Sequence, residues 1–244
     1  MNIKKLLVGT TMLLGMTSAF ADLATVKANL KIQYPSTTIT SVEESPIKGI
    51  YEVVLGKNIT YTDESAKFFL FGDVIRMSDQ TNLTSPKRDD LKKLDFASLP
   101  LKDAIKYTKG NGSRKIAVFS DPQCPFCKKL EAELLKLDNV TIYIFTNPIV
   151  GLHPEARNLS KKIWCSKDKA KAWREYLLSS IEPKSDGLCE NPVDRNIGLA
   201  QSLGLNGTPM SVLEDGSVIE GSVSFGELDY KLDKVANDLK NKKK

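Results

Sequence analysis

The sequence predicts an α+β protein with a small helix-plus-sheet domain first and a larger α/β domain second. Three observations support this prediction. Apolar residues recur at helical spacing at Leu23, Val26 and Leu30, directly after an apolar leader. Residues 38–77 then form short β-rich runs separated by turn residues. From residue 115 onward, strand-like and helix-like segments alternate, which is typical of a sheet covered by helices.

The first 21 residues have the layout of a cleavable secretory signal. Lys4-Lys5 is a basic start, residues 6–16 are mostly apolar, and Ala19-Phe20-Ala21 supplies the small residues that a signal peptidase requires. A membrane anchor is the alternative, but a helix over these apolar residues reaches only about 16 Å, against about 30 Å of hydrocarbon. We therefore expect residues 1–21 to be removed after Ala21, which leaves an exported chain that begins at Asp22.

Composition limits the partners and the redox compartment. Loss of the leader removes two lysines and no acid, so the formal net charge falls from +5 to +3, an excess too small to predict a nucleic-acid partner. The chain has four cysteines. In an oxidising compartment they are expected to pair, whereas in a cytosolic chain the same number would favour a metal site.

Residues 22–80 are predicted to form the small domain. Its opening helix ends near Pro35, and alternating apolar positions then indicate strands at Tyr51, Val53 and Leu55 and again at Phe69 and Phe71. The segment contains no Cys, no His and no cluster of convergent acids. We therefore expect a structural or associative role for it rather than chemistry.

Residues 81–98 are polar and charged and are predicted to be a linker that contains a helix. Ser85-Pro86 suits a helix start because Pro fits the first turn, and Leu91 and Leu94 give a thin apolar stripe. The alternative is a surface helix of one continuous domain.

Residues 99–244 are predicted to form the larger domain. A buried-type strand at 115–120 leads through a turn into a helix at about 124–137, and a second strand follows at 140–145. A lysine-rich helical stretch covers 154–204, and two short strands flank the turn at Asp215-Gly216. The final helix begins at Ser224 with a capping box. It is expected to bury Leu228, Leu232, Val235 and Leu239.

The segment Cys124-Pro125-Phe126-Cys127 carries the predicted chemistry, because it follows a buried strand and opens a helix. The free N–H groups and the positive dipole end of a helix favour a thiolate at its first residue. The dipole alone is too weak, so we expect backbone N–H groups to donate to the Cys124 sulfur as well. Cys124 is therefore the predicted nucleophile. Cys127, one turn further in, is predicted to resolve the mixed disulfide.

Two other interpretations of this pair fit the sequence less well. A CxxC segment can be half of a zinc site, but two more ligands are needed and the other cysteines lie 24 residues apart. The sole histidine, His153, lies in a predicted loop and is expected to be a surface residue rather than a ligand. A purely structural disulfide suits the strand-to-helix context less well. We expect no metal and no cofactor.

With these segments together, the mature chain resembles the DsbC/DsbG family of periplasmic disulfide isomerases along nearly its whole length. The resemblance rests on residues 119–130, on residues 163–169 and on Gly207-Thr208-Pro209. Residues 163–169 are the most specific, because they match the helical insertion of this family. The resemblance implies a thioredoxin-like catalytic domain with that insertion. It also implies a V-shaped homodimer that pairs through its amino-terminal domains.

The resemblance further implies the roles of particular residues. Cys124 is the attacking cysteine, Cys127 its partner, and Thr208 and Pro209 form a cis-proline loop that contacts substrate. Cys165 and Cys189 form a permanent disulfide in the insertion. The implied activity is reduction and isomerisation of incorrect disulfides in misfolded or mis-oxidised exported proteins, with a membrane thiol reductase as electron donor.

Two other functions remain open at this point, a disulfide oxidase and a chaperone-like binding dimer whose redox activity is secondary. The chain also departs from the family in two ways. Pro125-Phe126 stands where the best-known isomerases have Gly-Tyr, so the balance of isomerase, reductase and oxidase activity is not predicted. Val118 stands where thioredoxin has a buried acid, so proton transfer to Cys127 requires water or another group.

Overall fold

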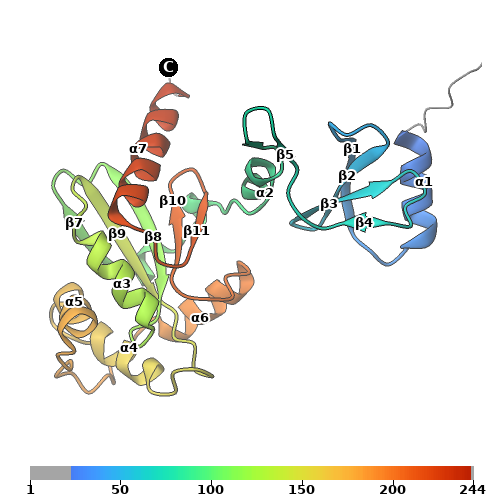
Figure 1. Ribbon diagram of the computed structural model, residues 1–244. Helices are drawn as coiled ribbons and strands as arrows, with labels where there is room; N and C mark the ends of the chain where they lie inside the picture. The colour runs from blue at the N-terminus through green and yellow to red at the C-terminus, as the bar shows by residue number, and fades with distance from the viewer. Residues whose placement is uncertain (1–22, 243–244) are drawn as a thin grey trace, which may run out of the picture. The chain divides into compact units, whose positions relative to one another are not determined.

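The computed structural model describes residues 23–242. The predicted signal and its cleavage site after Ala21 lie outside the described residues. Contacts divide the chain after Arg88, which gives a first unit of described residues 23–88 and a second of 89–242 (Figure 1). The predicted linker at 81–98 is therefore divided between the two units. None of the helices in the described range combines the length and the apolar character needed to cross a bilayer.

The first unit packs a helix against a four-stranded antiparallel sheet with the order β1-β2-β3-β4, and a two-stranded ribbon and a short helix follow (Figure 1). The elements are α1 (Leu23–Gln33), β1 (Ile39–Glu44), β2 (Ile50–Leu55), β3 (Asn58–Asp63), β4 (Phe69–Leu70), β5 (Ile75–Arg76), β6 (Thr81–Asn82) and α2 (Ser85–Leu91).

The core of this unit lies between α1 and one face of the sheet. Val26 and Leu30 of α1 pack with Tyr51 and Val53 of β2. The predicted strand is confirmed, and its alternating residues Tyr51, Val53 and Leu55 share the core with α1, but the residues between its two ends are all buried. The side chain of Glu52 is among them, at 6% exposed. Both faces of this strand are therefore covered, one by α1 and the other by a polar network.

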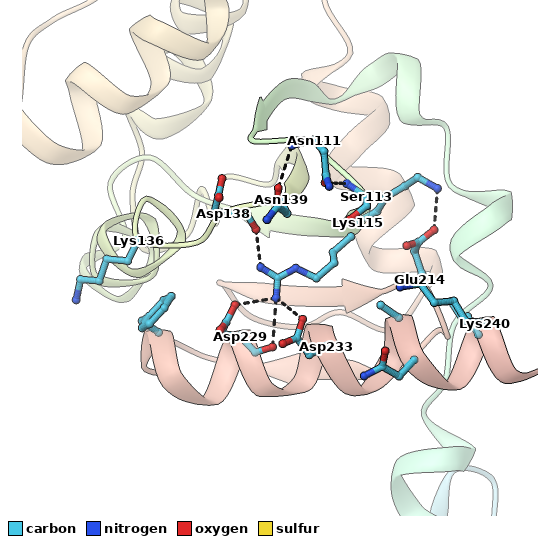
Figure 2. Close-up of a pocket in the computed structure, with 15 residues that line it drawn as sticks. Asn111, Ser113, Lys115, Lys136, Asp138, Asn139, Glu214, Asp229, Asp233 and Lys240 are labelled. Atoms are coloured by element: carbon cyan, nitrogen blue, oxygen red, sulfur yellow. Dashed lines mark hydrogen bonds and ion pairs between the residues drawn. The ribbon is translucent and has the colours of Figure 1, made fainter.

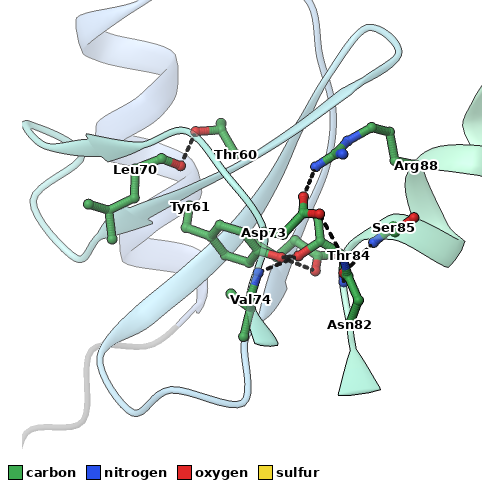
Figure 3. A network of polar contacts seen from close by, with 10 residues as sticks. Thr60, Tyr61, Leu70, Asp73, Val74, Asn82, Thr84, Ser85 and Arg88 are labelled. Carbon is green, nitrogen blue, oxygen red and sulfur yellow. Dashed lines mark hydrogen bonds and ion pairs between the residues drawn. The ribbon is translucent and has the colours of Figure 1, made fainter. Parts of the chain in front are cut away.

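That network fastens residues 73–88 to the sheet (Figure 3). Tyr61 donates to the buried Glu52 carboxylate at 3.4 Å and also bonds to the hydroxyl of Thr84, while Lys87 donates to the other Glu52 oxygen at 2.8 Å. A buried carboxylate is tolerated only with such partners. The side-chain oxygen of Asn82 accepts the N–H groups of Thr84 and Ser85 and so caps the start of α2.

The second unit is built on a five-stranded sheet with the order β11-β10-β8-β9-β7, in which only β8 and β9 run parallel. The elements are η1 (Phe96–Ser98), η2 (Leu101–Asp103), β7 (Ile105–Lys109), β8 (Arg114–Ser120), α3 (Pro125–Leu134), β9 (Val140–Thr146), α4 (Ala156–Trp164), α5 (Lys169–Ser179), α6 (Val193–Ser202), β10 (Met210–Leu213), β11 (Val218–Glu220) and α7 (Phe225–Asn241).

Helices cover both faces of this sheet, so β8 is buried on both sides. Ile116 and Val118 face a core shared with α3, α4, α5 and α7. Ala117 and Phe119 face a second core that includes α6. Since successive strand residues point to opposite faces, this uninterrupted apolar run is what a central strand requires. It leads the chain directly to the cysteine pair.

The predicted elements of this unit are confirmed with small shifts at their ends. Helix α3 ends at Leu134 rather than near residue 137. Ser224 caps α7 by accepting the N–H of Glu227 at 3.3 Å. Of the four leucine and valine residues expected in its buried stripe, Leu239 is only partly buried because it lies in the last turns of the helix.

A buried arginine joins α7 to the start of β8 beside a polar surface pocket (Figure 2). The Arg114 side chain is 10% exposed and donates to Asp229 at 2.7 Å and to Asp233 at 2.8 Å. It also donates to the carbonyl oxygen of Asp138, which precedes β9. Arg114 therefore ties three segments together at the end of β8 opposite the cysteine pair.

We expect Arg114→Met to destabilise the second unit by about 1–3 kcal/mol, because charge-assisted hydrogen bonds of a buried group are lost. Asp233→Asn is the matched control, since its carboxylate is 63% exposed and should contribute less than about 1 kcal/mol. Urea unfolding followed by tryptophan fluorescence measures both variants, because both tryptophans, Trp164 and Trp173, lie in this unit. Equal losses in the two variants would contradict the anchoring role of Arg114.

Candidate active site

The two cysteines of the CxxC segment lie at the start of α3, where the turn after β8 ends. Cys124 is the N-cap residue of this helix, Pro125 is its first residue, and Cys127 lies one turn further in. The turn is closed by the backbone, because the N–H of Cys124 donates to the carbonyl oxygen of Asp121 at 3.2 Å. The strand, the turn and the helix therefore fix both sulfur atoms.

Both thiols are free, and they differ in depth. Cys124 is 6% exposed and Cys127 is 1% exposed, so the upstream cysteine is the more accessible of two nearly buried groups. The Cys124 thiol donates to the carbonyl oxygen of Thr208 at 3.5 Å. The peptide bond between Thr208 and Pro209 is cis. The structure thus brings together four of the residues singled out from the sequence.

The expected N–H donation to Cys124 is wrong. The Cys124 side chain makes no capping hydrogen bond, and the residue that follows it is a proline without an N–H. The backbone donor instead serves the deeper sulfur, because the N–H of Asp121 donates to Cys127 Sγ at 3.3 Å. The backbone N–H of this turn therefore donates to the sulfur of Cys127 rather than to that of Cys124.

Burial raises the pKa of the Cys127 thiol to about 12. Hydrogen bonds from the Ser120 hydroxyl, the Asp121 N–H and the Thr208 hydroxyl act in the opposite direction, and the neighbouring Cys124 adds to the increase. The net result is a thiol that stays protonated at neutral pH. Since the thiolate is the nucleophilic form of a cysteine, burial makes Cys127 a weaker nucleophile at neutral pH than an unperturbed thiol.

Two residues next to this pair were missed or misjudged from the sequence. Asp121 is fully buried, and its carboxylate accepts the N–H of Gln123 at 2.8 Å and that of Ile149 at 2.7 Å. His153 was expected at the surface, but its Nδ1 lies 2.9 Å from Asp121 and only 24% of its side chain is exposed. An acid directly after a buried strand was the available signal for Asp121, whereas no residue near it in the sequence indicates that His153 is its partner.

A second buried acid lies one turn after Cys127 on α3. Glu131 accepts from the Tyr107 hydroxyl at 2.7 Å and from Trp173 Nε1 at 3.0 Å. Burial raises the pKa of this carboxyl group, and the two hydrogen bonds and Arg174 act against the increase. These contacts tie α3 to β7 and α5, and helical spacing from Cys127 was the available signal for this position.

The other two cysteines are bonded to each other in the helical segment between β9 and β10. Cys165 is the C-cap residue of α4, and Cys189 lies in the loop before α6, with their Cα atoms 5.7 Å apart. The bond closes a loop across a sequence separation of 24 residues, a size for which about 3 kcal/mol of stabilisation is typical. Neither cysteine belongs to the CxxC cluster.

Comparisons with known proteins agree with this architecture. Residues 17–85 match the disulfide bond isomerase protein N-terminal domain family, and residues 101–236 match the thioredoxin-like domain family. A probable thiol:disulfide interchange protein DsbC of Bordetella pertussis is 33% identical over 207 residues, which cover 85% of this chain and 73% of the relative. The thiol:disulfide interchange protein DsbC of Escherichia coli is 26% identical over 185 residues, covering 75% and 76%.

A solved structure adds a comparison of the fold. The disulfide interchange protein from Neisseria gonorrhoeae is 40% identical, with a TM-score of 0.53, and the match covers 57% of this chain and 97% of that one. The cysteine pair at a helix start, the thioredoxin-like sheet and these relatives lead to the same assignment. The chain belongs to the DsbC family of thiol:disulfide interchange proteins, enzymes that exchange thiols and disulfides.

Proposed function

We propose that this chain reduces and rearranges incorrect disulfide bonds in exported proteins of the periplasm, with Cys124 as the attacking thiol and Cys127 as the resolving thiol. The observation that carries the proposal is the arrangement of the pair. Cys124 lies beside the cis peptide of Thr208 and Pro209, and Cys127 lies behind it with a pKa raised by burial to about 12. We assign substrate contact to Thr208 and Pro209.

The reaction begins when the Cys124 thiolate attacks a substrate disulfide. A bond forms between Cys124 and one substrate sulfur, and the other substrate sulfur leaves as a thiolate. That thiolate, or another substrate thiol, can then attack the mixed disulfide and complete an isomerisation. Alternatively, Cys127 attacks Cys124 and releases reduced substrate. Because Cys127 is protonated at neutral pH, this release is slow, and the delay favours rearrangement over simple reduction.

The same arrangement requires a supply of electrons. The predicted leader supports export to a compartment in which thiols are oxidised. An isomerase there needs its cysteine pair reduced, and we assign that task to a membrane thiol reductase. We also propose that the Cys165–Cys189 bond is permanent and structural, since it joins the end of α4 to a loop and lies outside the CxxC cluster.

We further propose that the first unit pairs two copies of the chain and that residues 99–244 form the catalytic domain. Strand β4 is an edge of its sheet, and the exposed apolar side chains around it include Phe68 at 72% and Phe71 at 78%. Exposed apolar edges of this kind favour association through added strand pairing and burial. A paired arrangement would hold one unfolded substrate between two cysteine pairs, which gives the dimer a chaperone-like contribution.

Cys124→Ser should abolish the refolding of a substrate with scrambled disulfides, because the attacking sulfur is removed. Cys127→Ser should instead accumulate mixed disulfides with substrate, because the resolving sulfur is removed. Non-reducing electrophoresis after acid quenching measures both outcomes. Alkylation of the thiols in cells separates an isomerase, whose pair is reduced, from an oxidase, whose pair is bonded. Full activity of Cys124→Ser would contradict the assignment.

The resolving step should accelerate with pH. Since the pKa of Cys127 is about 12, its thiolate fraction should rise about tenfold per unit between about pH 7 and pH 9. The measurement uses an aromatic disulfide reagent that releases one coloured thiolate when Cys124 attacks it and a second when Cys127 attacks Cys124. A plateau of the second release below pH 9 would show that Cys127 ionises near neutrality.

Replacement of Phe68 and Phe71 by lysine should give a monomer, because the charged side chains oppose pairing at the β4 edge. The variant should keep the first reaction of Cys124 and lose most isomerisation of scrambled substrate. Tyr230→Lys is the matched control, since Tyr230 is 69% exposed but lies on α7 in the second unit. Sedimentation measures the state of assembly. A monomeric wild-type chain would remove the basis for the paired first unit.

A further inference from the structure

The carboxylate of Asp121 lies at the centre of the turn that carries both reactive cysteines, and the reaction described above leaves it without a role. It is fully buried, so its charge requires partners inside the protein. One oxygen accepts the N–H of Gln123 at 2.8 Å, which closes the turn between β8 and α3 from within. The other oxygen accepts hydrogen bonds from the loop that follows β9.

That loop follows β9 and ends at His153. The N–H of Ile149 donates to Asp121 Oδ2 at 2.7 Å, and His153 Nδ1 lies 2.9 Å from the same oxygen. The loop is held in its own shape, because the N–H of His153 donates to the carbonyl oxygen of Ile149 at 2.9 Å. His153 is the sole histidine of the chain and is partly exposed. A single carboxylate thus joins the turn, the loop and the histidine ring.

The backbone of Asp121 contacts both cysteine residues. Its carbonyl oxygen accepts the N–H of Cys124 at 3.2 Å, and its own N–H donates to Cys127 Sγ at 3.3 Å. Hydrogen bonds weaken steeply when the donor points away from the acceptor. The side-chain contacts of Asp121 hold the same residue whose N–H donates to the sulfur of Cys127.

We propose that Asp121 and His153 are positioning residues for the resolving step, in which they hold the Asp121 N–H against the sulfur that must become a thiolate. The inference rests on the proposed function and names the groups that make its second step possible. In that step a bond forms between Cys127 and Cys124, and the bond between Cys124 and the substrate sulfur breaks. The substrate sulfur leaves as a thiolate and takes up a proton, while Cys127 gives up its own proton to water.

The two-phase thiolate release described above tests this proposal with the full-length chain. Asp121→Asn replaces one acceptor oxygen by an amide that cannot accept, so the second release should slow about tenfold while the first changes less than about twofold. His153→Ala should slow the second release about threefold to fivefold. His153→Asn should restore it, because the asparagine amide N–H lies near the position of Nδ1.

The matched control is Asp103→Asn. Asp103 is a buried carboxylate of the same unit, but it pairs with Arg195 at 3.1 Å and belongs to the segment before β7. This variant should lose stability and keep the second release of the wild type. A second release that is unchanged in folded Asp121→Asn and His153→Ala would overturn the proposal, as would an equal slowing in Asp103→Asn. If Asp121→Asn does not fold, the second release of the two His153 variants tests the proposal without it.

The proposal and the proposed function fail in different ways. Absence of the first release in the wild-type chain would contradict the role of Cys124 as the attacking thiol. A normal first release together with an unaltered second release in the His153 variants would leave that role intact and remove only the positioning role of Asp121 and His153.

Discussion

Burial of Cys127 behind Cys124 is the constraint on which the chemistry of this protein depends. Removal of the sulfur from water disfavours its thiolate and raises its pKa to about 12, and three hydrogen-bond donors only partly offset this effect. The two cysteines therefore differ in environment although only two residues separate them. Under the proposed function, Cys124 at the helix start reacts with substrate, and Cys127 reacts later and more slowly.

The fold produces this difference through one strand and one turn. Strand β8 is apolar on both faces and holds the turn deep in the unit, where α3 must begin. The side chain of Cys124 makes no capping hydrogen bond, whereas the backbone N–H of Asp121 donates to the sulfur of Cys127. The polar contacts of the site therefore surround Asp121 and the deeper sulfur of Cys127. Cys124 lies instead beside the backbone of Thr208 and Pro209.

The first unit is organised around a different buried group. Glu52 is held by Tyr61 and Lys87, and the network extends through Thr84 to the segment that enters α2. It fastens the chain up to Arg88 to the small sheet, while Leu94 bonds to the β10–β11 turn of the second unit through the carbonyl oxygen of Gly216. The boundary between the units therefore falls inside α2, and the residues predicted as a linker belong in part to each unit.

Much of this was determined by the sequence alone. Apolar periodicity identified α1 and α7, a continuous apolar run identified β8, and the CxxC spacing after that strand identified the candidate pair at the start of α3, because these features depend on residues close together in the chain. The tertiary structure decided the rest. It placed the Thr208–Pro209 peptide beside Cys124, buried both faces of β2, and brought His153 to Asp121 across 32 residues. No local pattern contains such contacts, since the burial and direction of a polar side chain depend on segments that meet only when the chain folds.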